Sequence, residues 1–293
     1  MTALARLDSV TRTFGPVTAV DDVSITIDPG SMVGLLGPNG AGKTTVMSML
    51  QGLRRPTSGT VELFGGRPSD PRSRARLGCT PQETALPDVL RVGEVIDFVG
   101  AHFPDRTPTA ELADEFGLGE LLRRQTGSLS GGQKRRLSVA LAFVGKPQLV
   151  LLDEPTTGLD VDARRTLWDV VRAQHDRGVT IVVTSHYLEE IEALAERVIV
   201  MGNGRVLANN SLAGVLALVG QRLVTLHSPE FDRIAALEGV MRVDGNTFFV
   251  EDSDRFIARL VQSGLPFSDL TIRGASLEEA FLSITDSSVP SGV

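Results

Sequence analysis

A glycine-rich stretch constrains this chain more than any other feature of its sequence. The stretch follows a short apolar run, 32–36, that is typical of a buried strand, and it precedes a run, 46–50, that is typical of a helix. A strand, a glycine-rich loop ending in Gly-Lys-Thr and a helix together form the context of a phosphate-binding P-loop. The residues of the loop are Gly37, Pro38, Asn39, Gly40, Ala41, Gly42, Lys43, Thr44 and Thr45.

The residue types of this loop suit the binding of phosphate groups. Glycines let the backbone curl tightly, so that several N–H groups point at one anion. The helix N-terminus adds a partial positive charge. In such a loop Lys43 reaches the β- and γ-phosphates and the Thr44 hydroxyl holds Mg²⁺. The alternative is a glycine-rich turn with a surface lysine, which the flanking strand and helix disfavour.

Composition and charge exclude some classes of protein. The chain has 293 residues, with 42% hydrophobic and 22% charged residues, so it is long and apolar enough for one large domain and a small one. Its net charge of -7 gives no electrostatic footprint for nucleic acid. Cys79 is the single cysteine, which excludes an intramolecular disulfide, and we expect it to be a small buried residue near a strand end.

The sequence contains no apolar run of the length that a membrane-spanning helix needs, about 20 residues. Charged residues interrupt the N-terminal segment early, which is unlike a secretory signal; they are Arg6, Asp8 and Arg12. We therefore expect a chain that is soluble by itself. If it works at a membrane, another chain must span that membrane.

The order of apolar patterns indicates an α/β core with a helical insertion. Strand patterns at 4–10 and 17–27 precede the P-loop, helical patterns dominate between about 88 and 128, and strands then alternate with helices up to about residue 208. The pattern restarts near residue 220. We expect a large α/β core at 1–220 with its helical subdomain at about 88–145, a small α/β appendage at 221–286 and a disordered tail at 287–293.

Two acids end a second buried strand. The run 149–152 is wholly apolar and leads into Asp153 and Glu154, which places both carboxylates at the C-terminal edge of a parallel sheet, where α/β proteins bind ligands. Asp153 is suited to holding Mg²⁺, and Glu154 to positioning or deprotonating an attacking water. The alternative is a pair of solvated acids at a strand end. The P-loop earlier in the chain favours the catalytic interpretation.

A second possible anion site opens the helix that follows Leu129. Ser130 is suited to capping that helix, and two glycines leave its N-terminus open to an anion. The residues are Ser130, Gly131, Gly132 and Gln133. A phosphate site here is redundant beside the P-loop unless it serves the nucleotide of a second molecule. The alternative is a capped helix with a flexible entry.

The pentapeptide Leu-Ser-Gly-Gly-Gln, between the P-loop and the acidic strand, resembles the signature of ABC transporter ATP-binding subunits. The resemblance covers roughly residues 4–210. It implies a P-loop NTPase core of the ABC ATPase type, with an antiparallel β subdomain and a helical insertion. It also implies that the chain is an ATPase that uses ATP and Mg²⁺.

The resemblance extends to four further residues. Phe14 matches the aromatic that stacks on adenine, with a core aromatic as the alternative. Gln82 matches the glutamine that contacts Mg²⁺ and water, although Gly78-Cys79-Thr80 before it departs from the family's usual aromatic. Asp160 matches the loop at the dimer interface, and His186 matches the switch histidine that contacts the γ-phosphate.

In that family two such domains sandwich two ATP molecules, and each nucleotide contacts the P-loop of one domain and the signature of the other. The resemblance therefore implies a homodimer with two competent sites. Lys43 and the loop amides would balance the phosphates, Glu154 would handle the water, and His186 would complete the site. The residues implied for Mg²⁺ are Thr44, Gln82 and Asp153.

The C-terminal helix carries a weaker resemblance. The run 276–282, Ser-Leu-Glu-Glu-Ala-Phe-Leu, is similar to one in bacterial exporter ATPases of the daunorubicin-resistance type. This similarity implies a separate polytopic permease, export of a drug-like or hydrophobic compound, and a place at the cytoplasmic face of the cell membrane. The alternatives are a soluble ABC-type ATPase not coupled to transport and an importer ATPase.

Overall fold

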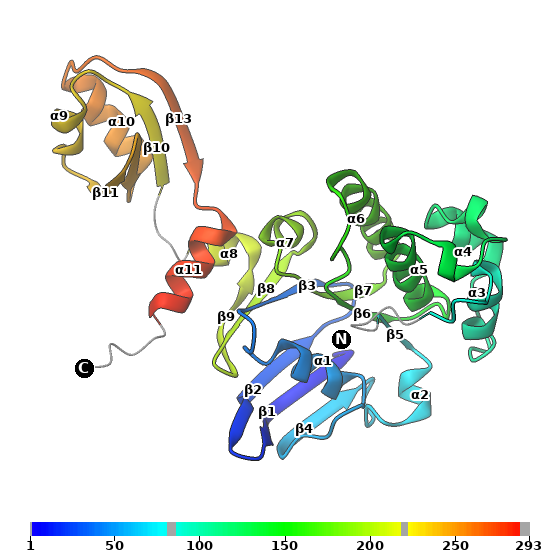
Figure 1. Cartoon of the computed structure of the whole chain (residues 1–293). Coiled ribbons are helices and arrows are strands. Elements are labelled where there is room, and N and C mark those ends of the chain that lie inside the picture. Colours follow the sequence, from blue (N-terminus) through cyan, green and yellow to red (C-terminus); the bar gives the residue numbers. More distant parts are fainter. Residues whose placement is uncertain (1, 81–85, 218–221, 288–293) are drawn as a thin grey trace. The chain divides into compact units, whose positions relative to one another are not determined.

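The computed structural model describes residues 2–80, 86–217 and 222–287, and the chain divides into two compact units (Figure 1). The units are Met1–Asn209 and Asn210–Val293. The domain boundary that the sequence predicts after residue 220 and the tail residues 288–293 lie outside the described residues. Ser287 itself is the last residue of a helix, although the sequence analysis assigned it to the tail.

A six-stranded sheet forms the centre of the first unit. Its strands lie in the order β5-β6-β7-β3-β8-β9, and the neighbours from β5 to β8 pair in parallel. Every residue of β3, β6 and β7 is buried, as expected for strands covered on both faces. The strands are β3 (Met32–Leu36), β5 (Leu77–Cys79), β6 (Leu149–Asp153), β7 (Thr180–Thr184), β8 (Arg197–Gly202) and β9 (Arg205–Ser211).

This strand order brings three distant sequence segments to one edge of the sheet. Strand β7 lies between β6 and β3, and all three run in the same direction. In the register, Thr184 is paired with Asp153 on one side and with Leu35 on the other. The loops that follow these strands are the P-loop, the segment from Glu154 and the segment that contains His186, so all three begin at the same carboxyl edge.

A three-stranded antiparallel sheet, in the order β2-β1-β4, packs beside the central sheet. Its inward side chains share one apolar core with β3, β6 and the first helix, and Leu7, Ile25, Met47 and Leu151 all belong to it. The strands are β1 (Ala5–Phe14), β2 (Val17–Ile27) and β4 (Ser58–Leu63). The predicted antiparallel β subdomain is present.

Helices cover the first unit and form its helical insertion (Figure 1). They are α1 (Lys43–Leu50), α2 (Pro71–Arg74), α3 (Val92–Gly100), α4 (Thr109–Glu115), α5 (Gly131–Phe143), α6 (Val161–Asp176) and α7 (Leu188–Leu194), with 3₁₀ turns at Gly119–Leu121 and Thr126–Ser128. The longest has 16 residues. No helix in the described parts of the chain is long and apolar enough to cross a membrane.

Two local expectations are wrong. The sequence predicts a helix from Glu120 to Arg124, but only a 3₁₀ turn forms at its start, because the backbone oxygens of Leu122 and Arg124 accept from the amides of Gly93 and Val92. Cys79 is exposed rather than buried. It ends β5, which is the edge strand of the central sheet and has a neighbour on one side only.

The second unit contains a four-stranded antiparallel sheet in the order β11-β12-β10-β13. Helices α9 and α10 interrupt the strands in a β-α-β-β-α-β order, and an apolar core around Phe248 and Phe256 joins them to the sheet. The elements are α8 (Leu212–Ala217), β10 (Arg222–His227), α9 (Phe231–Ala235), β11 (Val240–Asp244), β12 (Thr247–Val250), α10 (Ser253–Gln262), β13 (Ser268–Gly274) and α11 (Leu277–Ser287).

Candidate active site

The P-loop connects β3 to α1 with a backbone that leaves no room for side chains at two positions. A Cβ atom at Gly37 would lie 2.5 Å from the Met201 carbonyl oxygen, and one at Gly42 would lie 2.5 Å from that of Ala19. Gly42 also has a φ of 100°, a conformation that residues with a side chain rarely adopt. Glycine at these positions is therefore required for the tight curl that the sequence predicts.

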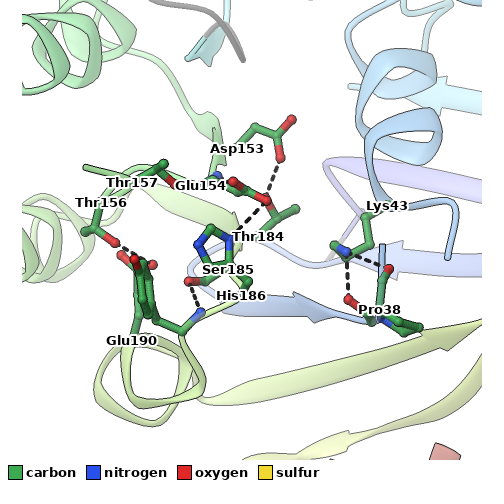
Figure 2. Close-up of polar contacts among 12 residues, drawn as sticks. Pro38, Lys43, Asp153, Glu154, Thr156, Thr157, Thr184, Ser185, His186 and Glu190 are labelled. Carbon is green, nitrogen blue, oxygen red and sulfur yellow. Dashed lines mark hydrogen bonds and ion pairs between the residues drawn. The ribbon is translucent and has the colours of Figure 1, made fainter. Parts of the chain in front are cut away.

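Lys43 begins α1 and folds back over the loop. Its Nζ donates to the carbonyl oxygens of Gly37, at 2.7 Å, and Pro38, at 3.1 Å. Burial lowers the pKa of Lys43 from its usual value, while the nearby carboxylates of Glu154 and Asp153 oppose this shift. Figure 2 shows Lys43 facing the acidic side chains from the P-loop. If a polyanion such as a chain of phosphates bound beside Lys43, the ammonium group would exchange its contacts with neutral carbonyl oxygens for contacts with negatively charged oxygens.

A cleft of about 720 Å³ adjoins the start of α1. Phe14, Thr44, Thr45 and Asp153 all line it, although they come from three separate parts of the sequence. Their shared cleft brings together the predicted adenine contact and two of the predicted Mg²⁺ ligands. A hydroxyl and a carboxylate are oxygen donors of the kind that Mg²⁺ prefers, so the residues present fit this ion.

Phe14 stands at the end of β1 with 36% of its surface exposed, which disagrees with the alternative of a core aromatic. The guanidinium carbon of Arg12 lies 4.6 Å from the ring centroid and that of Arg54 lies 5.0 Å from it. Both contacts are of the cation–π kind. Phe14 therefore stands at the cleft with its ring covered by guanidinium groups, and a nucleobase that stacks on this ring would have to displace one of them.

Asp153 and Glu154 follow β6 in different environments. Asp153 is 7% exposed, accepts a hydrogen bond from the Thr184 hydroxyl, and donates its amide to the Thr80 hydroxyl at 2.9 Å. Glu154 is half-buried and has a φ of 49°, which is uncommon for a residue with a side chain. Backbone strain of this kind costs about 1–3 kcal/mol and clusters at functional sites.

Glu154 and His186 contact each other at the edge of the sheet. The Nδ1 atom of His186 lies 3.3 Å from Oε1 of Glu154, and the Thr157 hydroxyl donates to Oε2 at 3.2 Å. The backbone amide of Glu154 donates to the Thr184 hydroxyl at 3.0 Å, which ties β6 to β7 just before His186. The two residues that the sequence assigns to the reaction are therefore brought together (Figure 2).

The signature residues form a capped helix start. The Ser130 hydroxyl accepts from the Gln133 amide at 3.2 Å, and the Gln133 side chain accepts from the Ser130 amide at 3.0 Å. Gly131 has open space around the position of a Cβ atom. Among the described residues that line the 720 Å³ cleft, none of the four signature residues occurs. Asp160 similarly caps α6, accepting from the Ala163 amide at 2.8 Å.

Gln82 lies outside the described residues, which leave out 81–85. Thr80, two residues earlier, is described and buried, and its hydroxyl accepts a hydrogen bond from the Asp153 amide. Sequence reasoning missed the supporting roles of Thr80 and Thr184, whose hydroxyls contact the first acid. The only sequence signal for them is their place at the carboxyl ends of strands that flank β6.

Sequence reasoning also missed two buried charges beside the acids. Arg135, on α5, donates to the backbone oxygens of Glu154, at 2.6 Å, and Pro155, at 3.1 Å, and also to that of Asp153. Glu190, on α7, is fully buried. One signal in the sequence could have identified Arg135 and Glu190. Each is a charged residue on the face of a helix that otherwise carries apolar residues.

Comparison with known proteins decides the family. Residues 20–157 match the ABC transporter family. The chain is also 33% identical to the daunorubicin/doxorubicin resistance ATP-binding protein DrrA of Streptomyces peucetius, over 94% of this chain and 90% of that protein. The chain belongs to the ABC transporter family. It is likewise 36% identical to the Nod factor export ATP-binding protein I of Paraburkholderia xenovorans, over 97% of each.

Solved structures agree with the fold of this ABC protein. An ATP-binding subunit of an ABC transporter matches 74% of this chain and 93% of its own, with a TM-score of 0.68 and 27% identity. A dimeric ATP-binding cassette bound to ADP and Pi, at 24% identity, matches with a TM-score of 0.65 over 71% of this chain and 98% of its own. The predicted P-loop ABC ATPase fold is confirmed, and the chain is an ATPase.

Proposed function

We propose that this chain hydrolyses MgATP at sites shared between two copies and thereby powers export through a separate membrane permease. In each site Lys43 and the amides of the P-loop bind the phosphates, Phe14 stacks on the adenine, and Glu154 positions or deprotonates the attacking water. His186 orients Glu154 and meets the γ-phosphate. Phosphoryl transfer of this kind depends mainly on positioning and charge neutralisation.

Mg²⁺ would neutralise charge on the phosphate oxygens. The residues of this chain that would hold it are Thr44 and Asp153, with Gln82 assigned by the family resemblance. In support, Thr44 and Asp153 line the same cleft.

The observation that carries the proposal is the contact between His186 and Glu154, at 3.3 Å, at the strand edge that also bears the P-loop. A non-catalytic nucleotide-binding module has no need of this arrangement.

Sharing of each site between two copies is supported by the position of the signature. Ser130 and the glycines after it form a helix start that does not line the chain's own cleft, and Ser130 itself is exposed. Asp160, also exposed, starts α6 close to the acids in sequence. A homodimer gives both segments a partner: they would meet the nucleotide bound to the other copy's P-loop.

The export direction and the permease are supported by the relatives. One is named for daunorubicin and doxorubicin resistance and another for Nod factor export. Both are matched across nearly their whole length, including the second unit. We therefore assign this chain to the cytoplasmic face of a cell membrane, with a drug-like or hydrophobic compound as cargo.

Co-purification tests the transport part of the proposal. The tagged chain is expressed in its native host, extracted in mild detergent, and its partners are identified by mass spectrometry against an untagged control. We expect a polytopic membrane protein in stoichiometric amount. Recovery alone, or with ribosomes or nucleic acid, would instead support a soluble ABC-type ATPase. Recovery with a permease and a substrate-binding protein would support an importer.

A further inference from the structure

The buried Glu190 lies beside the catalytic pair and has no part in the mechanism described above. It is the third residue of α7, and none of its surface is exposed. A buried carboxylate costs several kcal/mol unless partners compensate for lost hydration. The fold therefore retains a group that an apolar residue would replace at lower cost, and its contacts indicate why.

Glu190 accepts hydrogen bonds from two other segments of the chain. Its Oε2 accepts from the Thr156 hydroxyl at 3.0 Å, and its Oε1 accepts from the Trp168 indole at 3.0 Å. Burial raises the pKa of Glu190, and these hydrogen bonds and the nearby His186 oppose that shift.

This arrangement places Glu190 close to both catalytic residues. Thr156, its donor, follows Glu154 by two residues, and Glu190 itself follows His186 by four residues. Thr156 is 1% exposed, so water cannot replace Glu190 as its acceptor. Figure 2 shows the contact between Thr156 and Glu190.

Arg135, on α5, contacts the same segment after β6. Its guanidinium donates to three successive carbonyl oxygens, those of Asp153, Glu154 and Pro155. Burial lowers the pKa of Arg135, while the charges of Asp153, Glu154 and Glu190 oppose the shift. The segment after β6 is thus held by a buried guanidinium on α5 and a buried carboxyl group on α7.

We infer that Glu190 is a positioning residue for ATP hydrolysis, which sets the separation of Glu154 and His186 by anchoring both of their loops. The inference rests on the roles proposed for those two residues. Because none of its surface is exposed, Glu190 does not reach a nucleotide or solvent directly. It accepts from Thr156 in the loop of Glu154 and stands on the helix that follows His186, so a movement of either loop is transmitted to the other. Its bond to Trp168 extends this coupling to α6, which begins just after Asp160.

Kinetics of Glu190→Gln test this role, with Glu189→Gln as the matched control. Glu189 is the adjacent residue on the same helix and lies nearer the surface. The carboxamide that replaces the Glu190 carboxylate has one acceptor oxygen, so it cannot accept from both Thr156 and Trp168 in the present geometry. We expect kcat to fall about ten- to hundredfold, because misplacement of catalytic groups by about 1 Å costs up to that much. The KM and the Kd for ATP, measured separately, should stay within about twofold, since no phosphate contact changes.

Substitutions of Thr156 keep the test decisive if Glu190→Gln does not fold. Thr156→Val removes the donor while keeping the shape, and Thr156→Ser keeps the donor. We expect Thr156→Val to lower kcat with an unchanged Kd for ATP, Thr156→Ser to retain most of the rate, and Thr156→Val to add little to Glu190→Gln in a double-mutant cycle.

Two results would overturn the inference. One is a kcat for Glu190→Gln equal to that of Glu189→Gln, and the other is an equal effect of Thr156→Val and Thr156→Ser. The variant Glu154→Gln, assayed alongside, separates the two levels of the account. If it is slow while Glu190→Gln is normal, only the positioning role falls. If Glu154→Gln turns over normally, the proposed role of Glu154 falls as well.

Discussion

At the level of single residues, the site is defined by how Glu154 is held. Its φ of 49°, its contact with His186 and the three carbonyl contacts of Arg135 all concern one short peptide. Sequence alone identifies Glu154 because it follows an apolar strand. Sequence alone cannot identify the residues that hold it, because Arg135 and Glu190 lie on helices far along the chain and only the fold brings them near.

Glu154→Gln tests the catalytic assignment. The glutamine side chain keeps the size of the original and can still bond to His186, but it cannot accept a proton from water. We expect hydrolysis to slow by about 10²-fold or more, the usual contribution of a general base, with ATP affinity little changed. Phosphate release and equilibrium nucleotide binding measure the two quantities. A turnover near that of the control Glu189→Gln would contradict the assignment.

Lys43 gives a prediction about pH. Burial lowers its pKa in the nucleotide-free fold, whereas in the unfolded chain a lysine has a pKa of about 10.4. Between these two values the unfolded state binds more protons than the folded state, so the free energy of unfolding rises with pH. Urea unfolding of the nucleotide-free protein should therefore show wild type gaining stability relative to Lys43→Met as pH rises through that window. If the difference in free energy of unfolding between wild type and Lys43→Met did not change with pH, the lowered pKa of Lys43 would be contradicted.

At the level of elements, the fold was largely predictable from apolar patterns. Strands β3, β6 and β7 are wholly buried and consist of largely uninterrupted apolar runs, so their parallel arrangement follows from the sequence. The helix expected at 120–124 does not form because carbonyl oxygens of this segment accept from the start of α3, a contact between distant residues that periodicity does not reveal. Strand order was also not predictable, since it depends on which elements pair across long loops.

The start of α5 gives a prediction at this level. Ser130→Ala removes one half of a reciprocal cap and should cost about 1 kcal/mol of stability. The matched control is Asp252→Ala, which removes a helix cap in the second unit. Asp252 caps α10 by accepting from the Asp254 and Arg255 amides. We expect similar stability losses by urea unfolding, with ATPase activity reduced by Ser130→Ala alone. Equal activity of the two variants would mean that Ser130 only caps its helix.

At the level of the whole molecule, one chain carries two starts of helices suited to phosphate. Among the described residues that line the 720 Å³ cleft are Thr44 and Thr45 of the P-loop but none of the signature residues. We propose that the signature serves the nucleotide of a second copy. The account rests on the claim that each nucleotide is shared: the P-loop and Glu154 come from one copy, and Ser130 comes from the other.

Mixing of inactive variants tests this claim most directly. Lys43→Ala and Ser130→Arg are each expected to be inactive, but a dimer with one copy of each has one intact site. Since random pairing makes about half of the dimers mixed and each has one of two sites, the mixture should regain about a quarter of the wild-type rate.

A control mixture of Lys43→Ala with Glu154→Gln should stay inactive, because both defects lie in the half-site that one chain supplies, so neither site of a mixed dimer is intact. Phosphate release in the two mixtures is the measurement. Recovery in the first mixture alone is the result that the account predicts. No recovery in the first mixture, or equal recovery in both, would contradict a site shared between two copies.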